Sequence, residues 1–535
     1  MANASEIIGK RLYLEGCRRA FGIPGGEVLV LVDGLRKSGI EFVLTKHENC
    51  AGFMAEGGFH ADGAPGILIA TLGPGVANSV NVVANAFQER VPLIFLTGCL
   101  DVQESLTYTH QVFDHSELLN SVTKTSIMLV DGAVDVAIDK AITIALDGQP
   151  GPVHVDVPIS LATKSQPESK MIVRSSPSPT TPAEGVDLET ARNWLIEAHR
   201  PLLIVGVDVL NQHVEKAVEK FSRAFQIPLI TTYKAKGVLP EDDPLALGGA
   251  GLSPLADKLF LPLLRVSDLI ILAGYDPIEM RVGWRNPWNE NARVIEFSAV
   301  PNTHFMHRAR LSFIGNVGEG LKTLCKNVSP HPVWNNGEPQ KVRYELKTIF
   351  SGKEEWGPAA LIDEVRKILP RDGVATADSG AHLILLCQMW ECYETRGLLQ
   401  STALCTMGCA IPLAMGFRLN APKRPVVAFV GDAGIEMVLG ELATLRDLKL
   451  PVVIVVFVDE SLALIELKQR NSGLPNLGVD FGATDFPAVA EALGGVGCWI
   501  SNRNELQNAL DGAFEHETFT LLACIIGEKV YDGRF

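Results

Sequence analysis

Short, uninterrupted apolar runs recur along the chain and alternate with stretches of mixed polarity. Runs such as Gly66–Thr71 and Leu93–Thr97 carry no charge, which is typical of strands buried on both faces of a parallel sheet. The stretches of mixed polarity that follow such runs predict helices, for example over Ala51–Phe59. The other predicted strands are Glu41–Leu44, Leu202–Val205, Leu269–Leu272, Val426–Val430 and Val452–Val458. This alternation predicts βαβ units, and therefore an α/β fold with doubly wound parallel sheets.

Two segments interrupt the alternation and divide the chain. Ser165–Glu184 is rich in Pro, Ser and Thr, and Asn327–Glu338 is similar in character. Such composition is typical of linkers between domains. We therefore predict three domains, at residues 1–170, 184–330 and 350–535, and a chain of 535 residues is long enough for them.

Composition excludes several classes of protein. The chain has 47 Lys and Arg against 62 Asp and Glu, a net charge of −15, which argues against a nucleic-acid partner. The longest apolar runs are far shorter than the roughly 20 residues of a membrane helix. Ten cysteines include no Cys-x-x-Cys pair, which argues against zinc ribbons and disulfide frameworks. The N-terminus has no signal-peptide pattern, and we expect a cytoplasmic protein with reduced thiols.

The most informative segment is 426–467. A strand run leads into Gly431-Asp432-Ala433-Gly434, a predicted helix over Glu436–Leu448 follows, and a second strand ends in Asp459-Glu460-Ser461. A right-handed crossover would place Asp432 and Asp459 near one another, beside a helix N-terminus that suits a phosphate. Two carboxylates and phosphate oxygens form a suitable site for Mg²⁺. The alternative is an ordinary turn in which Asp432 caps the helix.

This layout resembles the signature of thiamin diphosphate-dependent enzymes, in which Gly-Asp-Gly is followed 25–30 residues later by Asn or Asp. Ala433 takes the place of the second Gly, which matters little if the backbone N–H binds phosphate. Asp459 takes the place of the commoner Asn, a variant that resembles catabolic acetolactate synthases. The resemblance implies a metal held by Asp432, Asp459 and the carbonyl of Ser461. It covers essentially the whole chain, most loosely in the middle domain.

A second match lies in the first domain, where Glu48 directly follows the strand run Glu41–Leu44 and Thr45-Lys46-His47. By resemblance, Glu48 is the catalytic acid that hydrogen-bonds the aminopyrimidine of the cofactor, which activates the thiazolium carbon. The alternative is a helix-start residue that meets the helix dipole. Gln111 resembles a family residue that reaches the cofactor and the substrate. The alternative is a solvated amide in a loop.

Further matches complete the predicted site. The resemblance assigns cofactor contacts to Pro24, Gly25, Glu48, Gly73, Asn78, Gly380, His382, Cys405, Met407, Gly431, Asp432, Ala433, Gly434, Asp459, Ser461 and Leu462. We expect the substrate pocket at Gly26, Leu72, Gln111, Phe113, Leu464, Ile465 and Leu467. Met407 would hold the cofactor bent; without the family context it is a core methionine. Cys405 would offer its carbonyl, and no histidine partner is indicated for a nucleophilic thiol.

The resemblance implies decarboxylation of a 2-oxo acid such as pyruvate, followed by ligation to a second carbonyl compound. Alternatives are a decarboxylase that releases an aldehyde, a carboligase with a diketone or other ketone acceptor, and a cofactor-binding protein that has lost catalysis. The implied cofactors are thiamin diphosphate and Mg²⁺, with FAD left open. In the family the site lies between subunits, so a homodimer or homotetramer is expected.

Overall fold

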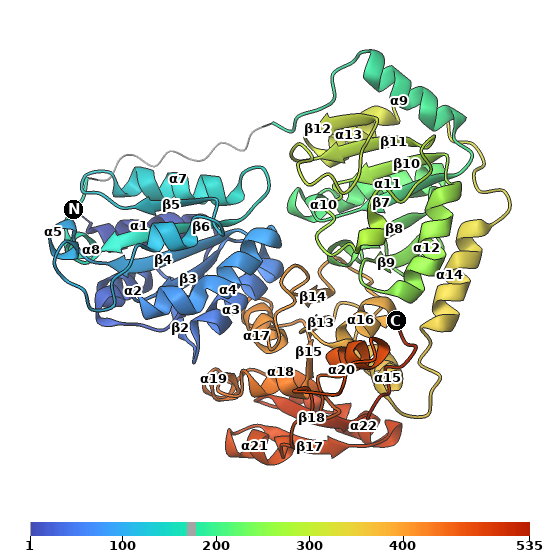
Figure 1. Ribbon diagram of the computed structural model, residues 1–535. Helices are drawn as coiled ribbons and strands as arrows, with labels where there is room; N and C mark the ends of the chain where they lie inside the picture. Colours follow the sequence, from blue (N-terminus) through green and yellow to red (C-terminus); the bar gives the residue numbers. More distant parts are fainter. Residues whose placement is uncertain (1, 168–177) are drawn as a thin grey trace.

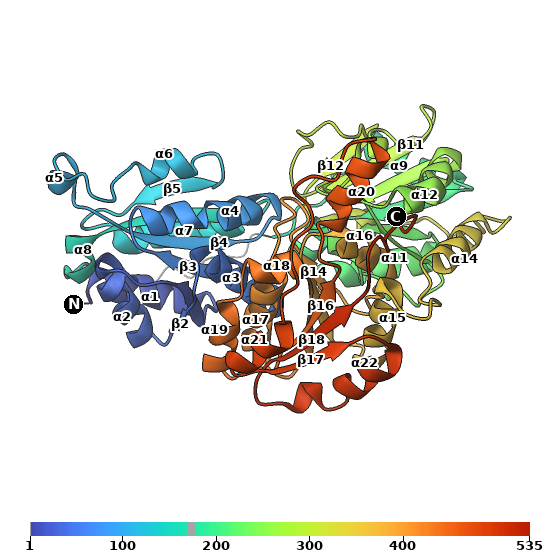
Figure 2. The ribbon, with the colours of Figure 1, turned by 60° about the horizontal axis from the view of Figure 1, so that its bottom comes forward.

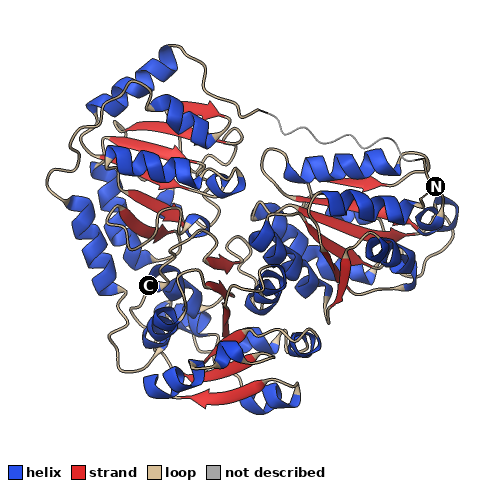
Figure 3. Ribbon diagram, turned by 180° about the vertical axis from the view of Figure 1, so that it is seen from behind, coloured by secondary structure: helices blue, strands red, loops and turns tan. Residues whose placement is uncertain are grey.

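The computed structural model describes residues 2–167 and 178–535 and contains three six-stranded parallel sheets (Figure 1). Helices cover both faces of each sheet, as the colouring by secondary structure shows (Figure 3). The predicted α/β class with doubly wound sheets is confirmed. Part of the predicted first linker, Ser165–Glu184, lies outside the described residues. No helix in the described part of the chain has the length and apolarity needed to cross a bilayer.

The first sheet has the strand order β2-β1-β3-β4-β6-β5. Its strands are β1 (Arg19–Gly22), β2 (Glu41–Leu44), β3 (Gly66–Ala70), β4 (Leu93–Cys99), β5 (Thr125–Met128) and β6 (Pro152–Pro158). Its helices are α1 (Ala4–Leu14), α2 (Leu29–Lys37), α3 (Glu48–Asp62), α4 (Pro74–Gln88), α5 (Val102–Ser105), α6 (His115–Leu119), α7 (Val134–Leu146) and α8 (Ile159–Thr163). Every residue of β3, β4 and β6 is buried, which explains the uninterrupted apolar or small residues of β3 and β4, whereas β6 also buries His154 and Asp156.

The second sheet has the order β12-β11-β10-β7-β8-β9. Its strands are β7 (Pro201–Val205), β8 (Leu229–Thr232), β9 (Ala246–Ala250), β10 (Leu269–Ala273), β11 (Arg293–Ser298) and β12 (Leu311–Ile314). Its helices are α9 (Val186–Glu197), α10 (Asp208–Asn211), α11 (Glu215–Phe225), α12 (Pro254–Val266) and α13 (Val317–Leu324). Helix α14 (Glu338–Ile349) begins at the last residue of the second predicted linker.

The third sheet has the order β14-β13-β15-β16-β18-β17. Its strands are β13 (Val374–Ala377), β14 (Leu398–Gln400), β15 (Val426–Gly431), β16 (Val453–Val458), β17 (Val496–Ile500) and β18 (Thr520–Ile525). Its helices are α15 (Pro358–Ile368), α16 (Ala381–Met389), α17 (Ala410–Asn420), α18 (Asp432–Glu436), α19 (Glu441–Asp447), α20 (Ala463–Asn471), α21 (Phe486–Ala492) and α22 (Arg503–Leu510).

The domains share apolar cores rather than standing apart. One core joins Phe53 and Met54 of α3 to Leu413 and Phe417 of α17, and another joins the second and third sheets. A side chain at Gly57 would lie 2.2 Å from the carbonyl oxygen of Leu413, so the close approach of α3 and α17 requires glycine there. Figure 2 shows α17 and α19 on the side of the third domain that faces the first.

The single helix predicted over Glu436–Leu448 is wrong. The structure has two shorter helices, α18 and α19, separated by a turn at residues 437–440. Met437, which an amphipathic helix would bury, is 66% exposed. Gly440 is the N-cap of α19, and a side chain there would lie 3.3 Å from the Cβ of Lys46 in the first domain.

Candidate active site

The predicted site residues gather at the carboxyl edges of two sheets. In the first domain they follow β1, β2, β3 and β4, which are neighbours in the sheet. In the third domain they follow β14, β13, β15 and β16, which are also neighbours. Ligands of open parallel sheets bind at this edge, because the loops that follow the strands converge there.

Glu48 is the first residue of α3, and its side chain is 6% exposed. The Nδ2 of Asn78 on α4 donates to Glu48 Oε2 at 3.0 Å, so two predicted cofactor residues hold each other. Gly75 leaves room beside the acid, since a side chain there would lie 3.4 Å from Glu48 Oε1. His47 caps the helix by accepting from the Asn49 N–H. A buried carboxyl fixed by one amide is suited to hold or transfer a proton.

Glu441 is a residue that sequence reasoning missed. Its Oε1 accepts from the backbone N–H groups of Lys46 at 2.9 Å and His47 at 3.1 Å, directly before Glu48. Glu441 is 1% exposed, and burial raises its pKa. The third domain therefore helps to fix the start of α3, through residues 394 positions apart in the chain.

Asp432 and Asp459 meet at the ends of β15 and β16. Asp432 Oδ2 accepts from the N–H groups of Asp459 at 3.0 Å and Glu460 at 2.7 Å. Gly431, not Asp432, occupies the N-cap position of α18, so Asp432 is not the helix cap of the alternative reading. Burial, followed by the charge of Asp432, raises the pKa of Asp459 to about 8. A buried acid and a half-buried acid in this relation favour a shared cation, and their oxygens are ligands that Mg²⁺ accepts.

Asp378, also missed as a site residue, organises the rest of this edge. It is fully buried, and its Oδ2 accepts from the Gly408 N–H at 2.7 Å. Its Oδ1 bonds His382 Nε2 at 2.9 Å and accepts from the Gly431 N–H at 3.2 Å. One carboxylate thus ties together the loops after β13, β14 and β15. The available signals were its position directly after β13 and its place at the start of Asp378-Ser379-Gly380-Ala381-His382, which resembles the family.

Met407 and Cys405 lie in the loop between β14 and α17, both half-buried. Cys405 adopts φ +50°, and its thiol donates to the Thr402 carbonyl at 3.3 Å. Burial, with the nearby Glu89 and Glu279, raises the pKa of the thiol, which disfavours the thiolate that a nucleophile needs. These features favour a structural role for the Cys405 backbone.

The substrate residues divide between the two edges. Leu72, Gln111 and Phe113 line a cavity of about 600 Å³ in the first domain. Gln111 is exposed and adopts φ +59°, and Phe113 is 41% exposed. The remaining predicted contacts lie elsewhere: Pro24, Gly25 and Gly26 in the turn after β1, and Leu462, Leu464, Ile465 and Leu467 in or next to α20. The α20 side chains do not line this cavity.

Comparisons with known proteins identify the family. Residues 2–118, 188–324 and 378–524 match the N-terminal TPP binding domain, the central domain and the C-terminal TPP binding domain of thiamine pyrophosphate enzymes, respectively. The chain belongs to the thiamine pyrophosphate enzymes. Its three sheets correspond to these three domains in order, and the cofactor implied is thiamin diphosphate.

Relatives of this thiamine pyrophosphate enzyme include acetolactate synthases. The chain is 27% identical to "Acetolactate synthase" of Bacillus subtilis (strain 168), over 95% of this chain and 90% of the relative. It is 27% identical to "Acetolactate synthase isozyme 3 large subunit" of Escherichia coli (strain K12), over 96% and 92%. It is 28% identical to the isozyme 1 large subunit of that organism, over 98% and 95%. The relation is distant but spans the whole length.

Proposed function

We propose that the chain decarboxylates a 2-oxo acid, pyruvate in the simplest case, and ligates the acyl unit to a second carbonyl compound, as an acetolactate synthase does. The observation that carries the proposal is one chain with the buried Glu48, held by Asn78, at one sheet edge and the Asp432–Asp459 pair at another. Full-length similarity to relatives named acetolactate synthase supports it. When bound, thiamin diphosphate supplies a carbon nucleophile that no side chain provides.

In this proposal Glu48 holds the proton that the pyrimidine of the cofactor needs, and Asn78 orients the carboxyl. Burial of Glu48 keeps water from competing for that proton. A general acid or base of this kind contributes about 10²–10⁴-fold to rate. Met407 would support the bent cofactor, and Cys405 would offer its backbone carbonyl.

Asp432, Asp459 and the carbonyl of Ser461 would hold Mg²⁺, with Ala433 and Gly434 close to the diphosphate. The fit rests on the meeting of Asp432 and Asp459 at the ends of β15 and β16. The raised pKa of Asp459 agrees with it, because a divalent cation relieves the repulsion that a proton otherwise relieves. Asp432 is oriented for this by its three backbone bonds, from Ala433, Asp459 and Glu460.

We propose an active site shared between two copies of the chain. Large apolar side chains are exposed at both edges: Val102 (67%) and Leu106 (82%) in the first domain, Leu474 (60%) and Leu477 (76%) after α20. A second copy would cover them. Mixing inactive Glu48→Gln and Asp432→Asn variants tests this, since a shared site regains activity in mixed dimers, whereas sites within one chain stay inactive.

The reaction is tested by incubating the protein with thiamin diphosphate, Mg²⁺ and pyruvate, with and without diketone acceptors. Acetolactate or an acceptor adduct supports the proposal, and acetaldehyde alone favours the second candidate, a non-ligating decarboxylase. The Asp459 variant and Gln111 favour the catabolic acetolactate synthase type, which would need no flavin. An absorbance spectrum with flavin bands would contradict that subtype.

A further inference from the structure

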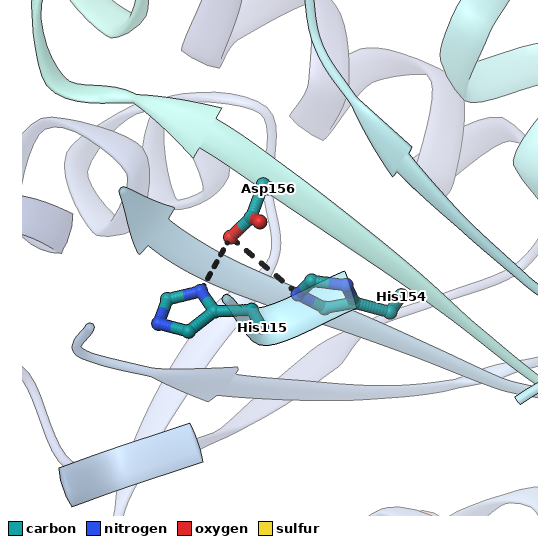
Figure 4. A group of neighbouring side chains, drawn as sticks. All are labelled: His115, His154 and Asp156. Atoms are coloured by element: carbon teal, nitrogen blue, oxygen red, sulfur yellow. Dashed lines mark hydrogen bonds and ion pairs between the residues drawn. The ribbon is translucent and has the colours of Figure 1, made fainter. Parts of the chain in front are cut away.

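Two histidines and an aspartate form a buried cluster (Figure 4), and two of its members, His115 and Asp156, line the same cavity as Gln111 and Phe113. His115 begins α6, and His154 and Asp156 lie on β6. Their exposures are 6%, 0% and 5%. His115 Nδ1 lies 2.8 Å and His154 Nε2 3.5 Å from Asp156 Oδ1. Nothing in the thiamin diphosphate site so far requires these three residues.

The hydrogen bonds around the cluster fix where each proton lies. The Gly73 N–H donates to His115 Nε2 at 3.2 Å, so that nitrogen carries the lone pair and Nδ1–H donates to Asp156. The Thr97 hydroxyl donates to Asp156 Oδ1 at 2.6 Å and therefore accepts from His154 Nε2 at 2.7 Å. His154 Nδ1 is then left to accept from Ser126 Oγ at 2.6 Å. Every ring nitrogen of the two histidines therefore has a hydrogen-bond partner.

This arrangement opposes a metal site, although the three side chains are close enough for one. A metal at His115 Nδ1 would require the proton on Nε2, where the Gly73 N–H already points. Burial alone would raise the pKa of Asp156, but the bond from His115 and the nearby His154 lower it, so the acceptor stays charged. The cluster is therefore a fixed hydrogen-bond anchor rather than a set of free ligands.

The hydrogen bonds of the cluster end at the turn of Gly73. This turn is connected both to the Glu48 side and to the Gln111 side of the predicted site. Gly73 adopts φ +68° and begins α4, which carries Asn78, the partner of Glu48. A side chain at Gly73 would lie 2.2 Å from the carbonyl oxygen of Gln111, so the Gln111 loop packs directly on this turn. His115 lies four residues beyond Gln111 on the same loop. Through the imidazole of His115, Asp156 thus fixes both the turn at Gly73 and the loop that carries Gln111.

We propose that His115 is a positioning residue for the substrate side of the active site, which it serves by accepting from Gly73 while donating to Asp156. The inference rests on the proposed function for its kinetic consequence. Without the Gly73 bond, the Gln111–Phe113 loop would lose its fixed distance from Glu48. Substrate affinity would fall, whereas the residues that hold the diphosphate lie in another domain and would be unaffected.

Two isosteric variants separate the two bonds of the ring. In His115→Gln, the amide oxygen can replace Nε2 and still accept from Gly73. In His115→Asn, the amide nitrogen can replace Nδ1 and still donate to Asp156, but the Gly73 bond is lost. Loss of one buried hydrogen bond predicts an increase of about 5- to 10-fold in the KM for the 2-oxo acid in His115→Asn. We expect His115→Gln to stay within about 2-fold, and both variants to keep kcat and thiamin diphosphate affinity.

Hydrogen exchange gives a readout that does not depend on turnover. Mass spectrometry of the peptide containing Gly73 should show faster amide exchange in His115→Asn than in wild type or His115→Gln. Equal exchange in the two variants, equal KM values, or one zinc per chain that depends on His115 would overturn the inference. A wild-type protein that processes no 2-oxo acid would refute the proposed function instead, and the exchange result would still decide whether the anchor exists.

Discussion

Glu279 couples the stability of the protein to pH, and its removal should be measurable. The residue follows β10, is 4% exposed and accepts from the Tyr233 N–H at 2.6 Å through Oε1. Its Oε2 is buried and has no hydrogen-bond partner among the described residues. Burial, followed by the charge of Glu89, raises the pKa of Glu279 from 4.5 to about 8. The native protein therefore keeps a proton that the unfolded chain releases.

The sign and size of the pH effect on the free energy of unfolding follow from this difference in bound protons. Because the pKa is higher in the folded state, the stabilising contribution is complete below the unfolded pKa near 4.5 and is lost as pH rises through about 8. In this window the free energy of unfolding falls by about 1.4 kcal/mol for each pH unit. Between roughly pH 6 and pH 8 the loss is about 2 kcal/mol. Glu279→Gln keeps an acceptor for Tyr233 but has no proton to lose.

Urea unfolding followed by tryptophan fluorescence tests this prediction at several pH values. Trp284 and Trp390 are buried in the core shared by the second and third sheets, so they report on the region around Glu279. The wild-type midpoint should fall from pH 6 to pH 8, and the Glu279→Gln midpoint should fall less. Exposed Glu290 provides the control Glu290→Gln, which should follow wild type. If the urea midpoints of wild type and Glu279→Gln fall in parallel with pH, Glu279 is not the source of the pH dependence.

Two further predictions concern the cofactor edge. Asp432→Asn should weaken thiamin diphosphate binding in the presence of Mg²⁺ by at least about tenfold, since a metal-ligating charge is removed; calorimetry showing wild-type affinity would exclude Asp432 as a ligand. Cys405→Ser should keep most of the activity, because the proposal uses only the backbone carbonyl and the thiol donates to Thr402, a bond that serine can form. A loss of about 10³-fold in kcat would instead indicate nucleophilic catalysis by the thiol.

The strands and the local motifs could be predicted because their causes are local. All six residues of β16 are buried, and the apolar run that predicts it is uninterrupted. Asp432 and Asp459 follow a strand directly and Glu48 follows one after three residues, so topology alone brings them to the two sheet edges. The three-domain division agrees with the three sheets, although the exact boundaries stay a prediction.

The missed features depend on contacts between distant segments. Glu441 acts on Lys46 and His47, and no pattern within α19 reveals that partnership. Glu441 is also the first residue of α19, which begins only after the turn at residues 437–440, where one longer helix over Glu436–Leu448 was predicted. His115 and Asp156 are 41 positions apart and meet only when the Gln111 loop folds back on the sheet. Sequence patterns carry local periodicity, whereas these pairs depend on tertiary packing.

We propose that Glu48 activates bound thiamin diphosphate. The rate at which the cofactor's C2 proton exchanges with solvent measures this activation most directly. Wild type and Glu48→Gln should bind the cofactor with similar affinity. We expect Glu48→Gln to slow C2 exchange by about 10²–10⁴-fold, because the side chain that activates the pyrimidine is lost. Exchange at the wild-type rate in the cofactor-loaded variant would contradict it.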